Sequence, residues 1–179
     1  MVNQGLDKLS ITEEFPENIP GIKSVNQAAF GRFDEANLVD QLRKTSPLFI
    51  SLVAKIAEHV VGHILFTPVT YVQPDGFSLE GLGLAPLAVL PEFQGKGVGT
   101  ALCWAGLKKS KAKGYPFIVV LGHPGYYSRF GFEPASKYNI TCAFDGIPDD
   151  AFMIRIVKQG MPTNLSGVVH YRQEFFDVT

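Results

Sequence analysis

Apolar side chains recur at intervals of three and four residues in two segments near the start of the chain. The repeated positions are Ile22, Val25 and Ala29 in the first segment and Leu38, Val39 and Leu42 in the second. This spacing aligns apolar side chains along one face of a helix. The pattern predicts helices over Ile22–Phe30 and Glu35–Lys44, with Asp34 as the residue that caps the second helix.

Runs rich in apolar and β-branched residues predict strands along most of the remaining chain. A short first strand is expected near Ile11, and Leu48–Ile56 and Val60–Val69 are expected to form a hairpin. An aromatic segment over His123–Phe132 is either a loop or a helix. The later predicted strands are Leu79–Leu90, Phe117–Leu121, Phe152–Val157 and Val168–Phe176.

A strand and a helix flank a glycine-rich turn in the middle of the chain. The strand Leu79–Leu90 contains Pro86, which has no N–H group to donate to a neighbouring strand. Proline at this position predicts an edge, a bulge or a local splay of the sheet. The helix is expected to begin at Gly99 or Thr100 and to end near Lys113.

The mixture of helices and hairpins favours an α+β fold with a mostly antiparallel mixed sheet over a doubly wound parallel sheet. The chain has 179 residues and contains no repeat, low-complexity stretch or linker-like segment. We therefore expect a single domain over residues 1–179. A hydrophobic fraction of 46% and 14 Phe residues supply a substantial core.

Charge and cysteine content argue against several classes of function. A formal net charge of −1 is unlike that of a general nucleic-acid binder, and no apolar run approaches the length of a membrane span. Two cysteines without Cys-x-x-Cys spacing and an N-terminus without an apolar signal segment indicate a cytoplasmic protein. The four histidines show no ligand spacing, so no metal site is expected.

Three glycines stand within five residues between the strand and the helix, in the stretch LPEFQGKGVGT. Converging backbone N–H groups and a helix N-terminus make such a turn an anion site. The P-loop motif is excluded because Lys96 is followed by Gly97 and no glycine stands at the required upstream position. The dinucleotide fingerprint is excluded because its third glycine position falls on Thr100 or Leu102. The spacing that remains is Q-x-x-G-x-G, formed by Gln94, Gly97 and Gly99.

This spacing resembles the pyrophosphate-binding motif of the GCN5-related N-acetyltransferases, the GNAT family. Similarity to that family's fourth strand and loop extends over LAPLAVLPEFQGKGVG, and similarity to its Tyr-x-x-x-Gly-Phe element over YYSRFGFEPA. With SLVAKIAEHVVGHILFTPV and GVVHYRQEF, the chain resembles the bacterial YhbS-like acetyltransferases over about residues 11–176. The resemblance implies the GNAT-type fold, with a sheet splayed between its fourth and fifth strands, and acetyl-CoA as the co-substrate.

The resemblance also implies how acetyl-CoA is held. Pantetheine would pair with the backbone of residues 87–89, and an N–H group near Ala88 or Val89 would bind the thioester oxygen. The pyrophosphate would lie on backbone N–H groups of the loop, where Lys96 adds charge and Thr100 adds a hydroxyl. The implied cofactor-binding residues are Leu87, Ala88, Val89, Gln94, Gly95, Lys96, Gly97, Val98, Gly99 and Thr100.

Catalytic roles follow from the same resemblance. Tyr127 occupies the position of the general acid, four residues before Gly131. A phenol is protonated at neutral pH and can donate to the CoA thiolate. Neighbouring Tyr126 stays open as the alternative acid, and Glu80 and His123 are the candidate bases, with Glu80 preferred.

The implied reaction is transfer of an acetyl group from acetyl-CoA to a primary amine in a ternary complex. The acceptor is a small molecule or a peptide, and the sequence leaves both its identity and homodimer formation open. Two alternative functions also remain open. One is a non-catalytic module that binds CoA or acyl-CoA, and the other is an acyltransferase with a different acyl donor or a non-amine acceptor.

Overall fold

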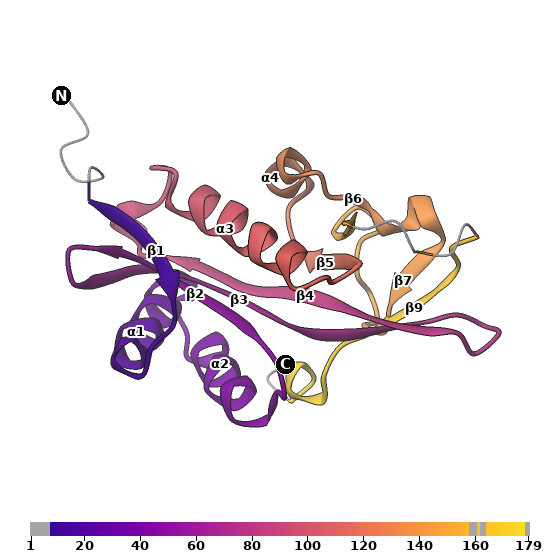
Figure 1. The fold of residues 1–179 in the computed structure, drawn as a ribbon, viewed down its shortest axis with the longest axis horizontal. Helices are drawn as coiled ribbons and strands as arrows, with labels where there is room; N and C mark the ends of the chain where they lie inside the picture. Colours follow the sequence, from indigo (N-terminus) through magenta and orange to yellow (C-terminus); the bar gives the residue numbers. More distant parts are fainter. Residues whose placement is uncertain (1–7, 158–160, 162–163, 178–179) are drawn as a thin grey trace.

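A computed structural model describes residues 8–157, 161 and 164–177. The strands are β1 (Leu9–Glu13), β2 (Ile50–Ile56), β3 (His59–Val72), β4 (Ser78–Val89), β5 (Phe117–Leu121), β6 (Glu133–Pro134), β7 (Ile140–Cys142), β8 (Phe152–Ile156) and β9 (Gly167–His170). Within the described residues they form one nine-stranded sheet in the order β1-β2-β3-β4-β5-β8-β6, with β9 beside β3 and β7 beside β9 (Figure 1). The β4–β5 and β7–β9 pairs are parallel, and the other pairs are antiparallel.

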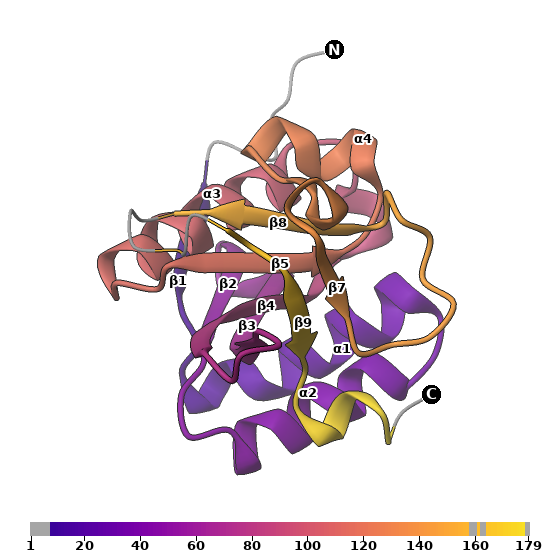
Figure 2. The same ribbon diagram turned by 90° about the vertical axis from the view of Figure 1, so that its right-hand side faces the viewer.

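Helices cover both faces of this sheet. They are α1 (Ile19–Phe30), α2 (Asp34–Thr45), α3 (Val98–Ala112) and α4 (Pro124–Tyr127). α1 and α2 lie against one face, and α3 lies against the opposite face (Figure 1, Figure 2). α4 follows β5 and lies on the side of α3 (Figure 1). The fold is therefore a mixed α/β sandwich of three layers.

The core consists of two apolar clusters, one on each face of the sheet. Side chains of β5 alternate between them: Ile118 and Val120 pack in the cluster that contains α3, and Phe117 and Val119 pack with α1 and α2. This period of two arises because successive side chains of a strand point to opposite faces. All four are fully buried, which explains why the β5 sequence is continuously apolar.

Several predicted elements are confirmed. The mixed fold, both early helices and the β2–β3 hairpin are present, and β5 has the predicted bounds. α1 begins at Ile19, three residues before the predicted start, and α3 begins at Val98. The aromatic segment after β5 contains α4 and a 3-10 turn at Ser128–Phe130.

The prediction that Asp34 caps α2 is wrong. Phe33 is the N-cap residue, Asp34 is the first residue of the helix, and no side-chain cap hydrogen bond forms. The Asp34 carboxylate instead lies 3.6 Å from Arg32 Nε. A carboxylate in the first turn still favours the helix through its dipole.

The predicted strand Val168–Phe176 is only partly present. β9 ends at His170, and the chain then forms a 3-10 helix over Gln173–Phe175. Tyr171 and Phe175 pack edge to face with ring centroids 5.3 Å apart, a contact at helical spacing that an alternating strand does not make. The short strands β6 and β7 were not predicted, because two or three residues carry no detectable alternation.

β4 and β5 run side by side for only part of their length. Their parallel ladder joins Leu82–Leu84 to Ile118–Val120, and within the described residues it ends there. Pro86 follows two residues later and has no N–H group to donate to a ladder. β4 therefore leaves an edge without a β5 partner from Ala85 to its end, which is the splay that the sequence predicts.

A β-bulge lies at the same place on the other edge of β4. Ile64 and Phe66 are two residues apart on β3, but they face Leu87 and Leu84, which are three residues apart on β4. The extra residue falls within Ala85–Pro86, where it bends the strand and increases its twist. It also shifts the alternation by one position, so that Leu87 packs toward the α3 cluster as Leu84 does before the bulge.

A series of hydrogen-bonded polar side chains runs along the face of the sheet that α1 covers. Asn26 Nδ2 donates to the carbonyl oxygen of Ile22 at 2.9 Å and lies 3.1 Å from His63 Nδ1. Because an amide nitrogen only donates, Nδ1 is the acceptor and the imidazole proton sits on Nε2. Nε2 lies 3.0 Å from Ser51 Oγ, whose hydroxyl donates to the Glu14 carboxylate. The series is complete only with a neutral imidazole.

The His63 side chain is fully buried, and Arg43 approaches from the far side of Glu14. Burial, with a smaller contribution from the Arg43 cation, lowers the pKa of His63 to about 3. An unfolded chain binds a proton on this imidazole near pH 6.5, whereas the folded chain does not. Folding stability is therefore greatest above pH 6.5 and falls as the pH drops toward 3.

We expect wild-type protein to lose on the order of 3 kcal/mol of unfolding free energy between pH 7 and pH 4 through His63. His63→Gln should be less stable at pH 7 but should lose less stability on acidification. Urea unfolding at pH 7 and pH 4 measures how much unfolding free energy each protein loses on acidification. His59→Gln, at an exposed position on the same hairpin, is the control. If wild type and His63→Gln lose the same unfolding free energy, His63 is not the source of the pH dependence.

Candidate active site

The loop between β4 and α3 is held in a backbone conformation that requires glycine. Gly95 has φ +69° and Gly97 has φ +89°, the left-handed region that side chains with a Cβ rarely adopt. A Cβ placed on either residue would meet nothing within 4 Å. The two glycines are therefore required by the turn itself, and the space above the loop is open.

α3 begins directly after this loop, with Gly97 as its N-cap residue. The first hydrogen bond of the helix runs from the Ala101 N–H to the Gly97 carbonyl oxygen at 2.9 Å. The N–H groups of the preceding first-turn residues have no partner within the helix and carry the positive end of its dipole. A strand, a glycine turn and a helix N-terminus therefore follow one another, which is the arrangement on which the predicted anion site depends.

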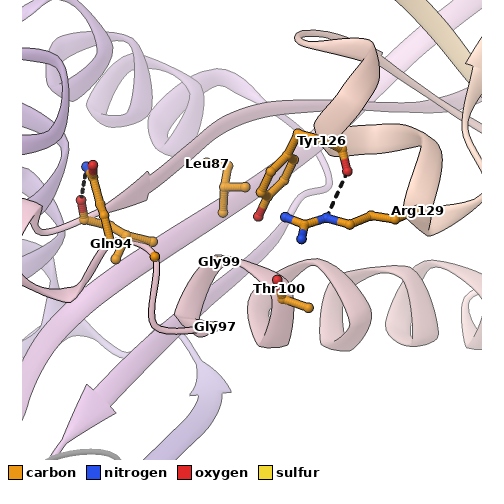
Figure 3. Close-up of a pocket in the computed structure, with 9 residues that line it drawn as sticks. Leu87, Gln94, Gly97, Gly99, Thr100, Tyr126 and Arg129 are labelled. Carbon is orange, nitrogen blue, oxygen red and sulfur yellow. Dashed lines mark hydrogen bonds between the residues drawn. The ribbon is translucent and has the colours of Figure 1, made fainter.

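A cavity of about 520 Å³ opens above the loop and the start of α3 (Figure 3). Gln94 closes one end, where its Nε2 donates to the Val89 carbonyl oxygen at 3.0 Å. The cavity is lined by Leu87, Val89, Gln94, Gly95, Gly97, Gly99, Thr100, Tyr126 and Arg129. We call it the donor cavity.

Most predicted cofactor-binding residues line the donor cavity, and three do not. Ala88 and Val98 are buried in the packing around β4 and α3. Lys96 is exposed, and its Nζ lies over the Phe93 ring at 5.5 Å from the centroid. These three residues do not form the wall of the donor cavity.

Arg129 is the wall residue that the sequence analysis missed. Its Nε donates to the Tyr126 carbonyl oxygen at 3.0 Å, and its guanidinium stacks 4.2 Å from the centroid of the Tyr126 ring. The guanidinium lies above the first turn of α3, between Tyr126 and Thr100 (Figure 3). Its position two residues before Gly131, inside the motif already recognised, was the signal available in the sequence.

A second cavity, of about 660 Å³, opens where β4 and β5 separate. It shares Leu87, Gln94 and Tyr126 with the donor cavity, so the two meet at the bulge of β4. It is lined by Phe30, Glu35, Leu38, Leu84, Ala85, Pro86, Leu87, Gln94, Leu121, Gly122, His123, Tyr126, Tyr127 and Phe175. We call it the acceptor cleft.

The two tyrosines of α4 face different surroundings. A Cβ on Gly99 would lie 2.7 Å from the Tyr126 hydroxyl oxygen, so this hydroxyl lies against the start of α3. Tyr127 instead packs against Gly122, where a Cβ would lie 2.3 Å from its Cε2 atom, and edge to face against Phe132. Burial raises the pKa of Tyr127, with smaller contributions from neighbouring groups. Its phenol therefore stays protonated at neutral pH.

The thiol of Cys103 is buried next to Tyr126. Cys103 lies one helical turn after Gly99 and interacts with the Tyr126 hydroxyl. Burial raises the pKa of the Cys103 thiol to about 12. A nucleophilic cysteine needs a lowered pKa and access to solvent, so Cys103 is unsuited to forming an acyl-enzyme intermediate.

The structure separates the two candidate bases. His123 lies two residues after β5, as the N-cap residue of α4, and lines the acceptor cleft. Its carbonyl oxygen accepts hydrogen bonds from the backbone N–H groups of Tyr126 and Tyr127. Glu80 is exposed at the other end of β4, seven residues and roughly 20 Å of strand before Leu87. It lies beside Tyr115, whose pKa is raised by burial and by the Glu80 carboxylate. The structure does not bring the preferred base to the site.

Two kinds of feature are absent from the part of the chain that the structure describes. Among these residues no helix combines the length and apolar character needed to cross a membrane. The same residues contain no group of three or more His, Cys, Asp or Glu side chains arranged to hold a metal ion.

Comparison with known proteins gives extensive similarity. The profile of the Acetyltransferase (GNAT) family matches residues 11–132. The protein named Uncharacterized N-acetyltransferase YhbS from Escherichia coli K12 is 35% identical over 166 residues, which cover 92% of this chain and 97% of that protein. Uncharacterized N-acetyltransferase YjhQ from the same organism is 42% identical over 117 residues, or 64% of each chain.

Two solved structures resemble the chain over almost its full length. The structure of the GNAT family N-acetyltransferase YhbS from Escherichia coli in complex with CoA superposes with a TM-score of 0.86 at 35% identity, covering 94% of this chain and 92% of that one. A GNAT family acetyltransferase from Brucella melitensis in complex with acetyl-CoA gives a TM-score of 0.76 at 33% identity, covering 93% and 97%.

Proposed function

Because the chain belongs to the Acetyltransferase (GNAT) family, we propose that it moves an acetyl group from acetyl-CoA to a primary amine by direct transfer in a ternary complex. The observation that carries this proposal is the meeting of the donor cavity and the acceptor cleft at the bulge of β4. A thioester entering from one side and an amine entering from the other would come into contact there. The relatives solved with CoA and acetyl-CoA support an acyl-CoA donor.

The pyrophosphate of acetyl-CoA would lie on the glycine loop and the first turn of α3. The N–H groups of Gly95–Thr100 supply donors there, and the Thr100 hydroxyl adds another. Arg129 would place its guanidinium against a phosphate oxygen, since the planar fork of arginine suits phosphate geometry. The site is built mostly from backbone, so it would recognise the donor through its phosphates.

Pantetheine would extend along the edge of β4 that β5 leaves unpaired. In this arrangement the backbone of residues 87–89 pairs with the amides of pantetheine as an added strand would. A backbone N–H near Ala88 or Val89 would bind the thioester oxygen as negative charge develops on it. The reacting carbonyl would then lie beside Leu87, at the boundary between the two cavities.

Proton transfers would be divided between Tyr127 and His123. Tyr127 lines the acceptor cleft, stays protonated because burial raises its pKa, and would donate its phenolic proton to the departing CoA thiolate. His123 lines the same cleft and would accept a proton from the amine on a ring nitrogen. Tyr126 would form a wall of the donor cavity.

Gly97→Asp is expected to weaken CoA binding by about a hundredfold or more, because a carboxylate beside the pyrophosphate is repelled. Isothermal titration calorimetry with CoA measures this. Gly76→Asp is the matched control, since Gly76 has the same φ of +89° and equally open surroundings. Gly76 lies in the loop between β3 and β4, away from the donor cavity. If Gly97→Asp binds CoA as tightly as Gly76→Asp, the pyrophosphate does not lie on the glycine loop.

Tyr127→Phe is expected to lower kcat by about a hundredfold, in the range for removal of a proton-transfer group, with CoA affinity unchanged. Tyr126→Phe should change kcat less than tenfold and act mainly on KM for acetyl-CoA. Release of free CoA thiol, followed with a saturating amine, separates the two variants. The reverse ranking of kcat would move the acid role to Tyr126.

Arg129→Ala is expected to raise the Kd for CoA by about tenfold or more, because a hydrogen bond to a charged group is lost. The affinity of the variant should also depend less on salt concentration than that of wild type. Lys113→Ala removes a cation at the opposite end of α3 and serves as the control. Equal affinities for the two variants would remove Arg129 from the donor site.

A further inference from the structure

We infer that the acceptor is a primary amine carried on an uncharged, apolar body, such as an alkylamine. This inference rests on the proposed transfer function and assigns the substrate class of the acceptor cleft. It follows from which described side chains form the wall of the cleft and from the hydrogen bonds that the Glu35 carboxylate already makes.

The wall of the acceptor cleft is aromatic and aliphatic beyond the reaction boundary. Phe30 and Leu38 come from α1 and α2, Leu84 and Leu121 from the separating strands, and Phe175 from the last 3-10 helix. Leu84 is buried at the base of the cleft, whereas Phe30 is 40% exposed. An acceptor that reaches the boundary at Leu87 must therefore pass its body along apolar surface.

Charge is scarce in this cleft. Among the described residues that line it, Glu35 is the one carboxylate, and neither lysine nor arginine lines it. Both Glu35 oxygens accept hydrogen bonds from Arg32, at 3.1 Å from Nε and at 2.5 Å from Nη2. The Glu35 charge is thus already compensated by a neighbour that does not line the cleft.

A second ammonium group on the acceptor would lose water in this cleft without gaining a free carboxylate. Burying an unpaired charge is costly, so diamines and polyamines are disfavoured there. A carboxylate on the acceptor is disfavoured for the same reason, because no lysine or arginine stands among the described residues of the cleft wall. The apolar wall also favours the neutral form of the attacking amine, which is the reactive form.

The test compares hexylamine with 1,6-diaminohexane, which share one carbon chain and differ by a second amino group. CoA thiol release is measured with wild-type protein, saturating acetyl-CoA and varied amine. We expect kcat/KM for hexylamine to exceed that for the diamine by about tenfold or more, since the extra charge has no partner in the cleft.

Two variants locate the preference within the cleft. Arg32→Gln removes an exposed cation and releases the Glu35 carboxylate, so it should raise kcat/KM for the diamine relative to hexylamine by about tenfold. Phe30→Ala should raise KM for hexylamine severalfold while leaving KM for acetyl-CoA unchanged. Phe33→Ala, a more exposed phenylalanine in the same turn that does not line the cleft, is the matched control.

The outcomes distinguish this inference from the proposed function. Faster turnover of hexylamine together with the Arg32→Gln shift supports the inference. Equal or faster turnover of the diamine by wild type overturns it and leaves amine acetylation intact. Binding of CoA without turnover of either amine overturns both the inference and the transfer function.

Discussion

The bulge at Ala85–Pro86 is the feature on which the rest of the site depends. It coincides with the end of the β4–β5 ladder, so the two strands separate there and leave one edge of β4 without a strand partner. It also shifts the side-chain alternation, which directs Leu87 and Val89 to the α3 side. Without the extra residue, Pro86 and Ala88 would occupy that side. The bulge therefore contributes to the walls of both cavities, through Leu87 in each and Val89 in the donor cavity.

The two cavities are built in different ways, and this difference determines what the sequence can reveal. The donor cavity depends on backbone conformation over a short continuous stretch, where positive φ angles demand Gly95 and Gly97. Such a site leaves a local signature, and most of its wall was predicted. The acceptor cleft instead combines residues from 30–38, 84–94 and 121–127 with Phe175, so no one continuous stretch of sequence marks it.

Long helices and strands were predictable because their periodicity is also a local signature. The predictions that did not hold have specific physical causes. Glu80 was preferred as a base on family resemblance, but the parallel pairing of Leu82 with Ile118 places it at the start of β5, far from the cleft. Arg129 was missed because its role depends on stacking over Tyr126, a contact set by α4. The strand predicted after His170 was wrong because Tyr171 and Phe175 meet across a helical turn.

Burial and pairing set the protonation states of the groups around the two cavities. Burial keeps Tyr127, in the wall of the acceptor cleft, as a phenol and keeps Cys103, next to Tyr126, as a thiol. On the acceptor side, the one carboxylate in the described wall is held by Arg32, and His123 lies where β5 ends. The side chains of α1, α2 and the last 3-10 helix that line the acceptor cleft do not line the donor cavity, so substitutions at these positions leave the wall around the glycine loop unchanged.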